Sequence, residues 1–302
     1  MTFSYHAYGL TIQSELECPE LLTLEPTDKY DISIHMAEIP EALENATHTT
    51  PNVQVRDETC QINIEDIARF RTIAGNTILV HPIAGVDLAN VRLFLLGTVF
   101  GTLIHQRGML PLHAGAVACN GRAYAFCGYS GAGKSTLCKA LQQHDFKLMC
   151  DDTGVLVPGR DETLFYPGFP RIKLWQDALD HFNVDTGDLI RDQSRTDKFH
   201  LLIHDTFHAE PLPLDSVFLL SRSEIQQTAS IQTVTGVEKM RALATQTYRP
   251  RMISHLKRHK YHFDLCSRIA NNINMFEYSR PWDLDQLEEN LPVLINNINK
   301  TR

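Results

Sequence analysis

One segment restricts what this chain can fold into more than any other: residues 128–135, which read GYSGAGKS. The segment matches GxxxxGK[ST] at every fixed position, a pattern typical of a loop whose backbone N–H groups surround phosphate oxygens. The glycines matter because some of these N–H groups turn inward only in conformations that a side chain disfavours. Such a loop is entered from a strand and leads into a helix, and the positive end of that helix faces the same phosphates.

The sequence on both sides of the loop agrees with this placement. Residues 113–119 read as a strand, and Asn120-Gly121 is a strong hairpin signal, since both central positions of a type I′ turn need a positive φ. Residues 122–127 then return as a second strand into the loop. A helix is predicted over 135–143 and a strand over 146–150, so the expected fold class is α/β with a P-loop core.

The loop also predicts the cofactors, ATP and Mg²⁺. Lys134 is expected to reach the β- and γ-phosphates, and the Ser135 hydroxyl to coordinate Mg²⁺. The full set of predicted nucleotide contacts is Gly128, Tyr129, Ser130, Gly131, Ala132, Gly133, Lys134, Ser135 and Thr136.

Two adjacent carboxylates, Asp151 and Asp152, follow the predicted strand 146–150. The interval after Lys134 has room for only one short helix and one short strand. The pair should therefore stand at the carboxyl end of a strand, which is where open α/β sheets bind ligands. Phosphoryl transfer needs a carboxylate near Mg²⁺ and a group that accepts the proton of the attacking hydroxyl. Two neighbouring carboxylates can divide these roles.

Three cations further along the chain are candidates for the same site, because phosphoryl transfer uses positive charge to stabilise its transition state. Arg171 and Lys173 lie in a segment rich in proline and glycine, and we expect an exposed loop there. Lys198 follows in RDQSRTDKFH. Arg171 is a candidate catalytic residue, and Lys173 and Lys198 are candidate substrate or phosphate contacts.

Three motifs, LPLHAGAV, GYSGAGKSTL and LMCDD, resemble the catalytic core of the HPr kinase/phosphorylase family. The longer stretches LIHQRGMLPLHAGAV and YPGFPRIKLWQDAL are similar to its stand-alone members found with lasso-peptide biosynthesis. The resemblance covers residues 105–300 and, more loosely, the β-rich N-terminus. It implies a fold of the HPr kinase and phosphoenolpyruvate carboxykinase type, and a homo-oligomer.

For the site, the resemblance implies that Asp151 is the base, that His113 is its partner, and that Asp152 lies near the metal with Ser135. It also gives Arg171 the role of a family arginine. The chain departs from the family here, because GFPRIKLW lacks the acidic partner of that arginine. The departure argues against the HPr protein as substrate.

Composition limits the partners and the compartment. The chain has 302 residues and a formal net charge of −8, which argues against nucleic acid as a partner. Seven cysteines without CxxC spacing predict reduced thiols in a cytoplasmic protein. The N-terminus lacks a basic start followed by an apolar run, and the apolar stretch 93–104 is too short to cross a bilayer. We therefore expect no membrane partner.

The chain is expected to divide into three parts. Residues 1–86 form a β-rich region with a hairpin turn at Gly75-Asn76. Residues 87–108 form a linking helix, which Asp87 caps and Gly108 ends. Residues 109–302 form the P-loop kinase domain.

The predicted function is an ATP-dependent kinase that transfers the γ-phosphate to a serine-type hydroxyl of a peptide or protein. The resemblance implies a ribosomally made peptide precursor as one such acceptor. Two alternatives stay open. One is a kinase for a small alcohol, since fold does not decide substrate. The other is a nucleotide-binding switch or ATPase, although such proteins usually place their second acidic motif farther from the loop lysine.

Overall fold

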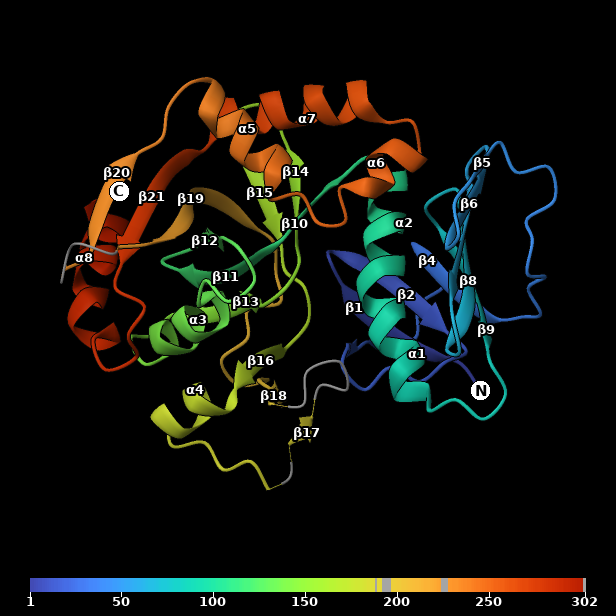
Figure 1. Cartoon of the computed structure of the whole chain (residues 1–302), viewed down its shortest axis with the longest axis horizontal. Helices are drawn as coiled ribbons and strands as arrows, with labels where there is room; N and C mark the ends of the chain where they lie inside the picture. The colour runs from blue at the N-terminus through green and yellow to red at the C-terminus, as the bar shows by residue number, and fades with distance from the viewer. Residues whose placement is uncertain (188, 192–196, 224–227, 301–302) are drawn as a thin grey trace. The chain divides into compact units, whose positions relative to one another are not determined.

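The computed structural model describes residues 1–187, 189–191, 197–223 and 228–300, and it divides into two compact units (Figure 1). Unit 1 comprises Met1–Pro111 and Thr247–Leu265, and unit 2 comprises Leu112–Gln246 and Cys266–Arg302. Two boundaries differ from the predicted ones. The helix expected over 87–108 belongs to unit 1, and so does 247–265, which was expected in the kinase domain. Long-range contacts cause this return of the chain; for example, the Tyr248 N–H donates to the Pro111 carbonyl at 2.7 Å.

Unit 1 is built on a nine-stranded sheet, as the alternating N-terminal sequence predicts. Its spatial order is β3-β1-β2-β4-β9-β8-β7-β6-β5, with β2–β4 and β4–β9 parallel. The predicted hairpin is confirmed: Ile73 pairs with Thr77, and Ala74 and Gly75 have φ of 49° and 70°. The strands are β1 (Phe3–Ala7), β2 (Leu10–Ser14), β3 (Leu22–Thr23), β4 (Ile32–Met36), β5 (His48–Thr49), β6 (Val53–Arg56), β7 (Thr59–Ile64), β8 (Ala68–Ile73) and β9 (Thr77–Pro82).

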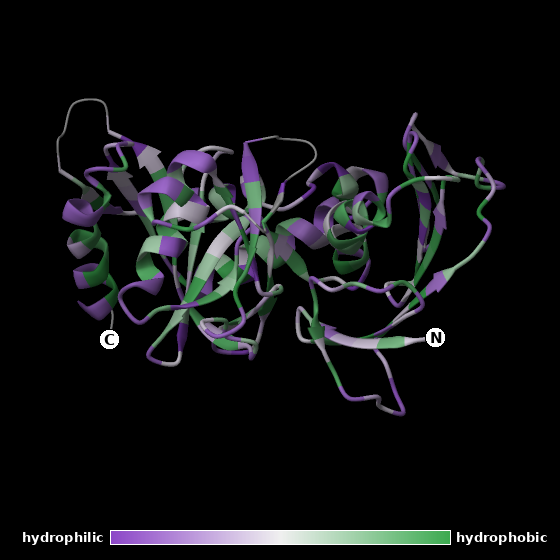
Figure 2. Ribbon diagram, turned by 90° about the horizontal axis from the view of Figure 1, so that it is seen from below, coloured by the Kyte–Doolittle hydropathy of each residue, from purple (hydrophilic) through white to green (hydrophobic). Residues whose placement is uncertain are grey.

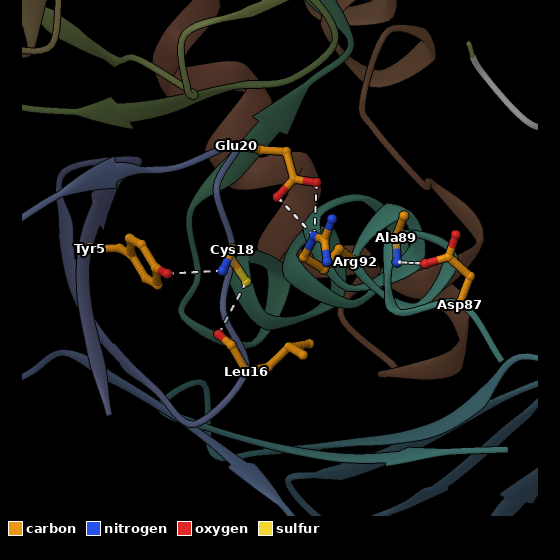
Figure 3. Close-up of polar contacts among 7 residues, drawn as sticks. All are labelled: Tyr5, Leu16, Cys18, Glu20, Asp87, Ala89 and Arg92. Carbon is orange, nitrogen blue, oxygen red and sulfur yellow. Dashed lines mark hydrogen bonds and ion pairs between the residues drawn. The ribbon is translucent and has the colours of Figure 1, made fainter. Parts of the chain in front are cut away.

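The predicted helix over 87–107 is confirmed as three consecutive segments, α1 (Leu88–Phe94), a π-helical turn η1 (Leu95–Val99) and α2 (Phe100–Gln106). Figure 3 shows its start, where the Asp87 carboxylate accepts a hydrogen bond of 2.9 Å from the Ala89 N–H. The Arg92 guanidinium also donates to both oxygens of Glu20, at 3.0 and 3.1 Å. Its buried side chains include Val91, Leu95, Val99, Phe100 and Leu103.

Within the described residues, one helical run is long and apolar enough to cross a membrane by length and composition, Leu88–Gln106. It has 19 residues and a mean hydropathy of 1.4, so the helix is longer than the apolar stretch on which the expectation of no membrane crossing was based. That expectation counted only residues 93–104, whereas the helix continues past both ends of the stretch. Of the apolar window in this helix, 56% is buried inside the protein, which is also typical of the core helix of a globular domain.

Unit 2 contains a second large sheet, in the order β10-β14-β15-β19-β12-β11-β13, with β21 beside β19 and β20 beside β21. Strands β12, β19 and β21 are parallel. Strand β13 runs the same way as β12, because both are antiparallel to β11. The strands are β10 (Leu110–Leu112), β11 (Ala114–Cys119), β12 (Arg122–Cys127), β13 (Lys147–Cys150), β14 (Gly154–Pro158), β15 (Thr163–Tyr166), β19 (Leu212–Arg222), β20 (Ser230–Thr233) and β21 (Asn274–Arg280).

Three phenylalanines fix the register of the parallel strands. Phe126, Phe218 and Phe276 are ladder partners on β12, β19 and β21, and neighbouring rings stack with centroids 5.6 and 5.4 Å apart. All three are buried. Cross-strand aromatic pairs of this kind stabilise one register over its neighbours. The carboxyl ends of these strands are therefore held at one edge of the sheet.

Helices and a small sheet complete the structure, which confirms the mixed α/β class. Figure 2 shows hydrophobic residues on the strands of unit 2 and both colours on its C-terminal helix, whose apolar side faces the core. The helices are α3 (Lys134–Gln142), α4 (Gln176–His181), α5 (Val237–Thr245), α6 (Arg251–His255), α7 (His259–Asn272) and α8 (Leu287–Lys300). The small sheet has the order β16-β18-β17, from β16 (Arg171–Trp175), β17 (Ile190–Arg191) and β18 (Lys198–Leu202).

Candidate functional site

The strand registers bring the three predicted motifs of unit 2 to one sheet edge. Ala114 pairs with Cys127 and Ala116 with Cys150. The residue before β11, His113, thus lies beside the residue after β12, Gly128, and near the residue after β13, Asp151. The Asn120-Gly121 turn makes this possible by reversing the chain, and its φ values of 51° and 75° confirm the predicted turn.

The loop after β12 has the backbone that its glycines allow. Gly131 and Gly133 have φ of 90° and 79°, in the left-handed region that disfavours other residues. The Ala132 N–H donates to the Tyr129 carbonyl at 3.0 Å, which tightens the turn. The Tyr129 side chain stands in solvent with 82% of its surface exposed, whereas Thr136 is buried in the first turn of α3.

Helix α3 begins directly after the loop without a side-chain cap. Gly133 is its N-cap residue and supplies no hydrogen bond to the first turn. The first N–H groups of a helix have no partner within the helix itself. Together with the positive end of the helix dipole, they form a site that suits an anion such as phosphate.

The side chain of Lys134 lies back against the loop. Its Nζ donates to the carbonyls of Gly128 and Tyr129, at 2.8 and 3.3 Å. Burial lowers the pKa of Lys134, and nearby Asp151 and Asp152 are among the groups that raise it. The ammonium group is thus largely removed from water at the place where the loop would hold phosphates.

Asp151 is buried, with 7% of its surface exposed. Its Oδ2 accepts a hydrogen bond of 2.7 Å from the Lys173 N–H, while Oδ1 is buried and has no hydrogen-bond partner in the part of the chain that the structure describes. Burial raises the pKa of Asp151, against the Ser135 hydroxyl and the charge of Lys198, which lower it. A carboxylate oxygen in this state is suited to binding a cation.

Asp152 has the opposite electrostatic character. Burial acts to raise its pKa, but a hydrogen bond and positive charge outweigh that effect and hold the pKa well below its ordinary range; the groups responsible are His113, Lys173 and Arg171. The His113 Nδ1 lies 3.0 Å from the Asp152 carbonyl and 3.3 Å from Oδ1. Because a carbonyl oxygen only accepts, Nδ1 carries a proton and donates it.

The contacts of the acidic pair differ from the predicted ones. The resemblance implied that His113 pairs with Asp151, but the His113 ring contacts Asp152. It also implied that Ser135 and Asp152 hold the metal together, but the Ser135 hydroxyl lies near Asp151, whose pKa it lowers. The physical reason is that adjacent residues leaving a strand point in different directions, so one carboxylate turns to α3 and the other to the start of β11.

The three candidate cations lie around this pair, but the expectation of an exposed loop is wrong for Arg171. Arg171 begins strand β16, is buried, and has its guanidinium 4.8 Å from the Phe169 ring centroid. Pairing with β18, a strand distant in sequence, makes this segment a strand. Lys198 lies 5.7 Å from the Trp175 ring centroid on the same sheet. Residues 192–196, which precede Lys198, lie outside the described residues.

The site is compatible with Mg²⁺ of the kind that accompanies nucleotides. Within the described residues there is no group of three or more His, Cys, Asp or Glu side chains that could hold a metal ion. Mg²⁺ in kinases is commonly bound by one or two protein oxygens together with phosphates and waters. The Asp151 Oδ1 atom, buried and without a hydrogen bond beside Ser135, fits that smaller requirement.

The sequence motifs did not include Arg280, which the structure brings to the loop. It ends β21, and its Nη2 atom lies 2.6 Å from the position that a Cβ atom would occupy at Gly133. Its proximity depends on the parallel pairing of β21 with β19, which no local pattern reveals. The available signal was an arginine at the end of a strand-like segment, Asn274–Arg280.

No protein-family model matches the chain, and no curated protein matches it in sequence. Among solved structures, it is similar to the Hpr(Ser) kinase/phosphatase from Coxiella burnetii, with 13% identity and a TM-score of 0.36. The match covers 63% of this chain and 97% of that one. Similarity at this level assigns no activity, so the proposal below rests on the residues themselves.

Proposed function

We propose that this protein is an ATP-dependent kinase of the HPr kinase type that phosphorylates a serine-type hydroxyl on a peptide or protein. One observation carries the proposal: the complete phosphate loop and the uncapped start of α3 share a sheet edge with two carboxylates of opposite electrostatic character. A loop alone would suit any nucleotide-binding protein. The adjacent pair supplies what transfer to a hydroxyl also needs, a metal-holding carboxylate and a proton acceptor.

The contacts support Asp151 and Ser135 as the protein groups that hold Mg²⁺. The two residues are close enough for the Ser135 hydroxyl to lower the pKa of the Asp151 carboxyl, and Oδ1 of Asp151 is buried with no hydrogen-bond partner among the described residues. A bound cation would offset the cost of keeping that oxygen ionised away from water. Held by these two residues, Mg²⁺ would supply positive charge that offsets the negative charge of the phosphates.

The same contacts support Asp152, with His113, as the group that receives the proton. The Asp152 side chain is 44% exposed, so an acceptor hydroxyl can reach it, whereas Asp151 is nearly closed off from solvent. Its low pKa keeps it ionised and able to accept a hydrogen bond from that hydroxyl at neutral pH. His113 fixes its orientation through the Nδ1–H contact. These roles exchange the two carboxylates relative to those that the family resemblance implies.

In the proposed step, the acceptor oxygen forms a bond to the γ-phosphorus as the bond from that phosphorus to the β-bridging oxygen breaks. The hydroxyl proton passes to the Asp152 carboxylate, and ADP leaves with the bonding electron pair. Lys134 and the first-turn N–H groups of α3 stabilise the charge that accumulates on the phosphate chain. Arg171, Lys173 and Lys198 add positive charge around the carboxylates, as their effects on the pKa values of these groups indicate.

The test has two stages. Isothermal titration should first detect binding of ATP that depends on Mg²⁺, and the absence of binding to folded protein would end the proposal. Radiolabelled ATP is then supplied with serine-containing peptides, with proteins, or with small alcohols. Label on a peptide or protein supports the proposed acceptor class, and label only on a small alcohol transfers the activity to that alternative. Release of phosphate at the same rate with every acceptor and with none identifies an ATPase.

A further inference from the structure

We propose that Arg280, at the end of β21, binds the phosphate chain of the nucleotide from the side of the loop opposite the acidic pair. The proposal rests on the nucleotide-binding function proposed above and adds a residue that lies far from the loop in sequence. It concerns binding of the phosphates rather than chemistry at the acceptor.

The position of the guanidinium is the first reason. Its Nη2 lies 2.6 Å from where a Cβ of Gly133 would be, so the group rests directly on the loop residue that precedes α3. Gly133 is thereby needed twice: its φ of 79° disfavours a side chain, and any side chain would also displace Arg280. The guanidinium therefore lies beside the start of a helix that has no side-chain cap.

The second reason is that this buried cation has no anionic partner in the part of the chain that the structure describes. Arg280 is 6% exposed, and among the described residues it forms no ion pair with a carboxylate. Its Nη1 donates to the Pro281 carbonyl at 3.2 Å, and its buried Nε has no hydrogen-bond partner among the described residues. A buried charge without a partner is unfavourable, so proteins that keep one usually pair it with a ligand.

The third reason is the geometry of the sheet. Strand β21 is parallel to β19, and β19 is parallel to β12, which leads into the loop. The carboxyl ends of such strands are where α/β sheets bind ligands. The N–H donors of a guanidinium lie in one plane and can donate to two phosphate oxygens at once. The ligand class that fits is therefore a nucleoside di- or triphosphate.

The neighbouring arginine provides a matched control. Arg222 is the ladder partner of Arg280 on β19, but it is exposed and lies 5.9 Å from the Trp282 ring centroid. Arg222→Met and Arg280→Met remove the same charge from adjacent strands at the same edge. Only the second removes a group that rests on the loop.

The experiment is calorimetric titration of the full chain with Mg²⁺-ADP, alongside thermal unfolding without nucleotide. Arg280→Met should weaken Mg²⁺-ADP binding by about 10- to 100-fold, the loss expected for a hydrogen bond to a charged group. Arg222→Met should change it by less than about threefold. Without nucleotide, Arg280→Met should unfold at the same or a higher temperature, because an unpaired buried charge has been replaced by an apolar side chain.

Two results would overturn the inference: unchanged affinity in Arg280→Met, or equal losses in both variants, which would indicate only a general effect of charge. If Arg280→Met does not fold, Arg280→Lys decides, since lysine lacks the planar pair of donors; weaker binding of Mg²⁺-ADP supports the inference and unchanged binding overturns it. Failure of the wild-type protein to bind Mg²⁺-ADP would instead remove the proposed function together with this inference.

Discussion

Each unit contains a helix that follows a strand of its large sheet, and the two helices begin in opposite ways. In unit 1, Asp87 caps α1 and accepts a hydrogen bond from the Ala89 N–H (Figure 3). In unit 2, α3 starts after Gly133, a residue with no side chain to cap it. At the start of α1, a side chain of the protein itself therefore accepts a hydrogen bond from the first turn. The start of α3 leaves its N–H groups available and has two cations beside it, Lys134 and Arg280.

This difference separates a structural helix start from one that serves a ligand. An acidic cap satisfies one of the first-turn N–H donors and contributes to stability. Without a cap, these N–H groups make no such contribution to stability, and buried cations next to them destabilise the fold further. In unit 2 both destabilising features occur at the same place, at the GKS triplet of the P-loop motif. The comparison predicts that changes at α3 alter binding and catalysis, and that changes at α1 alter only stability.

The largest effect should come from the first residue of α3. Lys134→Ala removes the cation that the loop holds through the Gly128 and Tyr129 carbonyls. A cation that stabilises phosphoryl transfer can contribute about 10³–10⁵-fold to kcat, so the rate of transfer should fall to the background level of the assay. Circular dichroism and thermal unfolding should show an intact fold, because the replaced group is a largely desolvated ammonium. Phosphoryl transfer at the wild-type rate in this variant would contradict the interpretation that the start of α3 binds phosphate.

The next largest effects should distinguish the two carboxylates. Asp152→Asn removes the proposed proton acceptor, a function that typically supplies about 10²–10⁴-fold in rate, and should leave Mg²⁺-ATP affinity nearly unchanged. Asp151→Asn should weaken Mg²⁺-dependent nucleotide binding, with partial recovery at high Mg²⁺. Single-turnover transfer and calorimetry at several Mg²⁺ concentrations measure both effects.

His113 supplies the control for this assignment. Because its ring contacts Asp152, His113→Ala should share the kinetic defect of Asp152→Asn, and the double variant should be little worse than either. If His113→Ala is instead non-additive with Asp151→Asn, the roles implied by the family resemblance are correct and the exchange proposed from the contacts is wrong.

A smaller effect concerns stability, and its sign should differ between the two carboxylates. The folded-state pKa of Asp151 is raised, so this group favours folding only below the unfolded pKa of about 3.9, and its contribution falls as pH rises through the folded pKa. At neutral pH, Asp151→Asn should therefore raise Tm, by about 2–4 °C for each 1 kcal/mol regained.

For Asp152, the folded-state pKa is lowered, so its contribution is present above about pH 4 and is lost as pH falls through the folded pKa. Asp152→Asn should lower Tm at pH 7 and still at pH 4, because the contribution of this carboxylate is lost only as the pH falls below about 4. Thermal unfolding of both variants at pH 4 and pH 7, without nucleotide or Mg²⁺, measures the two signs. A shift of the same sign at pH 7 would mean that the two carboxylates do not differ as described.

Local patterns were sufficient to predict the elements that depend on neighbours in sequence. The Asn120-Gly121 turn, the Asp87 cap and the strand–loop–helix around Lys134 each follow from a few adjacent residues, and the structure confirms them. These elements also located the acidic pair at the end of its strand.

Features that depend on distant pairing could not be predicted in this way. Arg171 was expected in a loop because proline and glycine precede it, yet pairing of β16 with β18 makes it a buried strand residue. Arg280 reaches the loop only through the β12-β19-β21 ladder. The direction of each carboxylate likewise depends on how β11 and α3 pack beside β13.

The smallest effect should come from the start of α1 and tests the structural half of the comparison. Asp87→Ala removes the acceptor of the Ala89 N–H, and the loss of such a cap typically costs about 1 kcal/mol. Thermal or urea unfolding should register that loss, while Mg²⁺-ADP affinity and the rate of transfer stay within error of wild type. Asp87→Asn is the matched variant, because asparagine also caps helices and should restore most of the stability. If Asp87→Ala reduced nucleotide affinity as strongly as a change at α3, the division between a structural and a ligand-serving helix start would not hold.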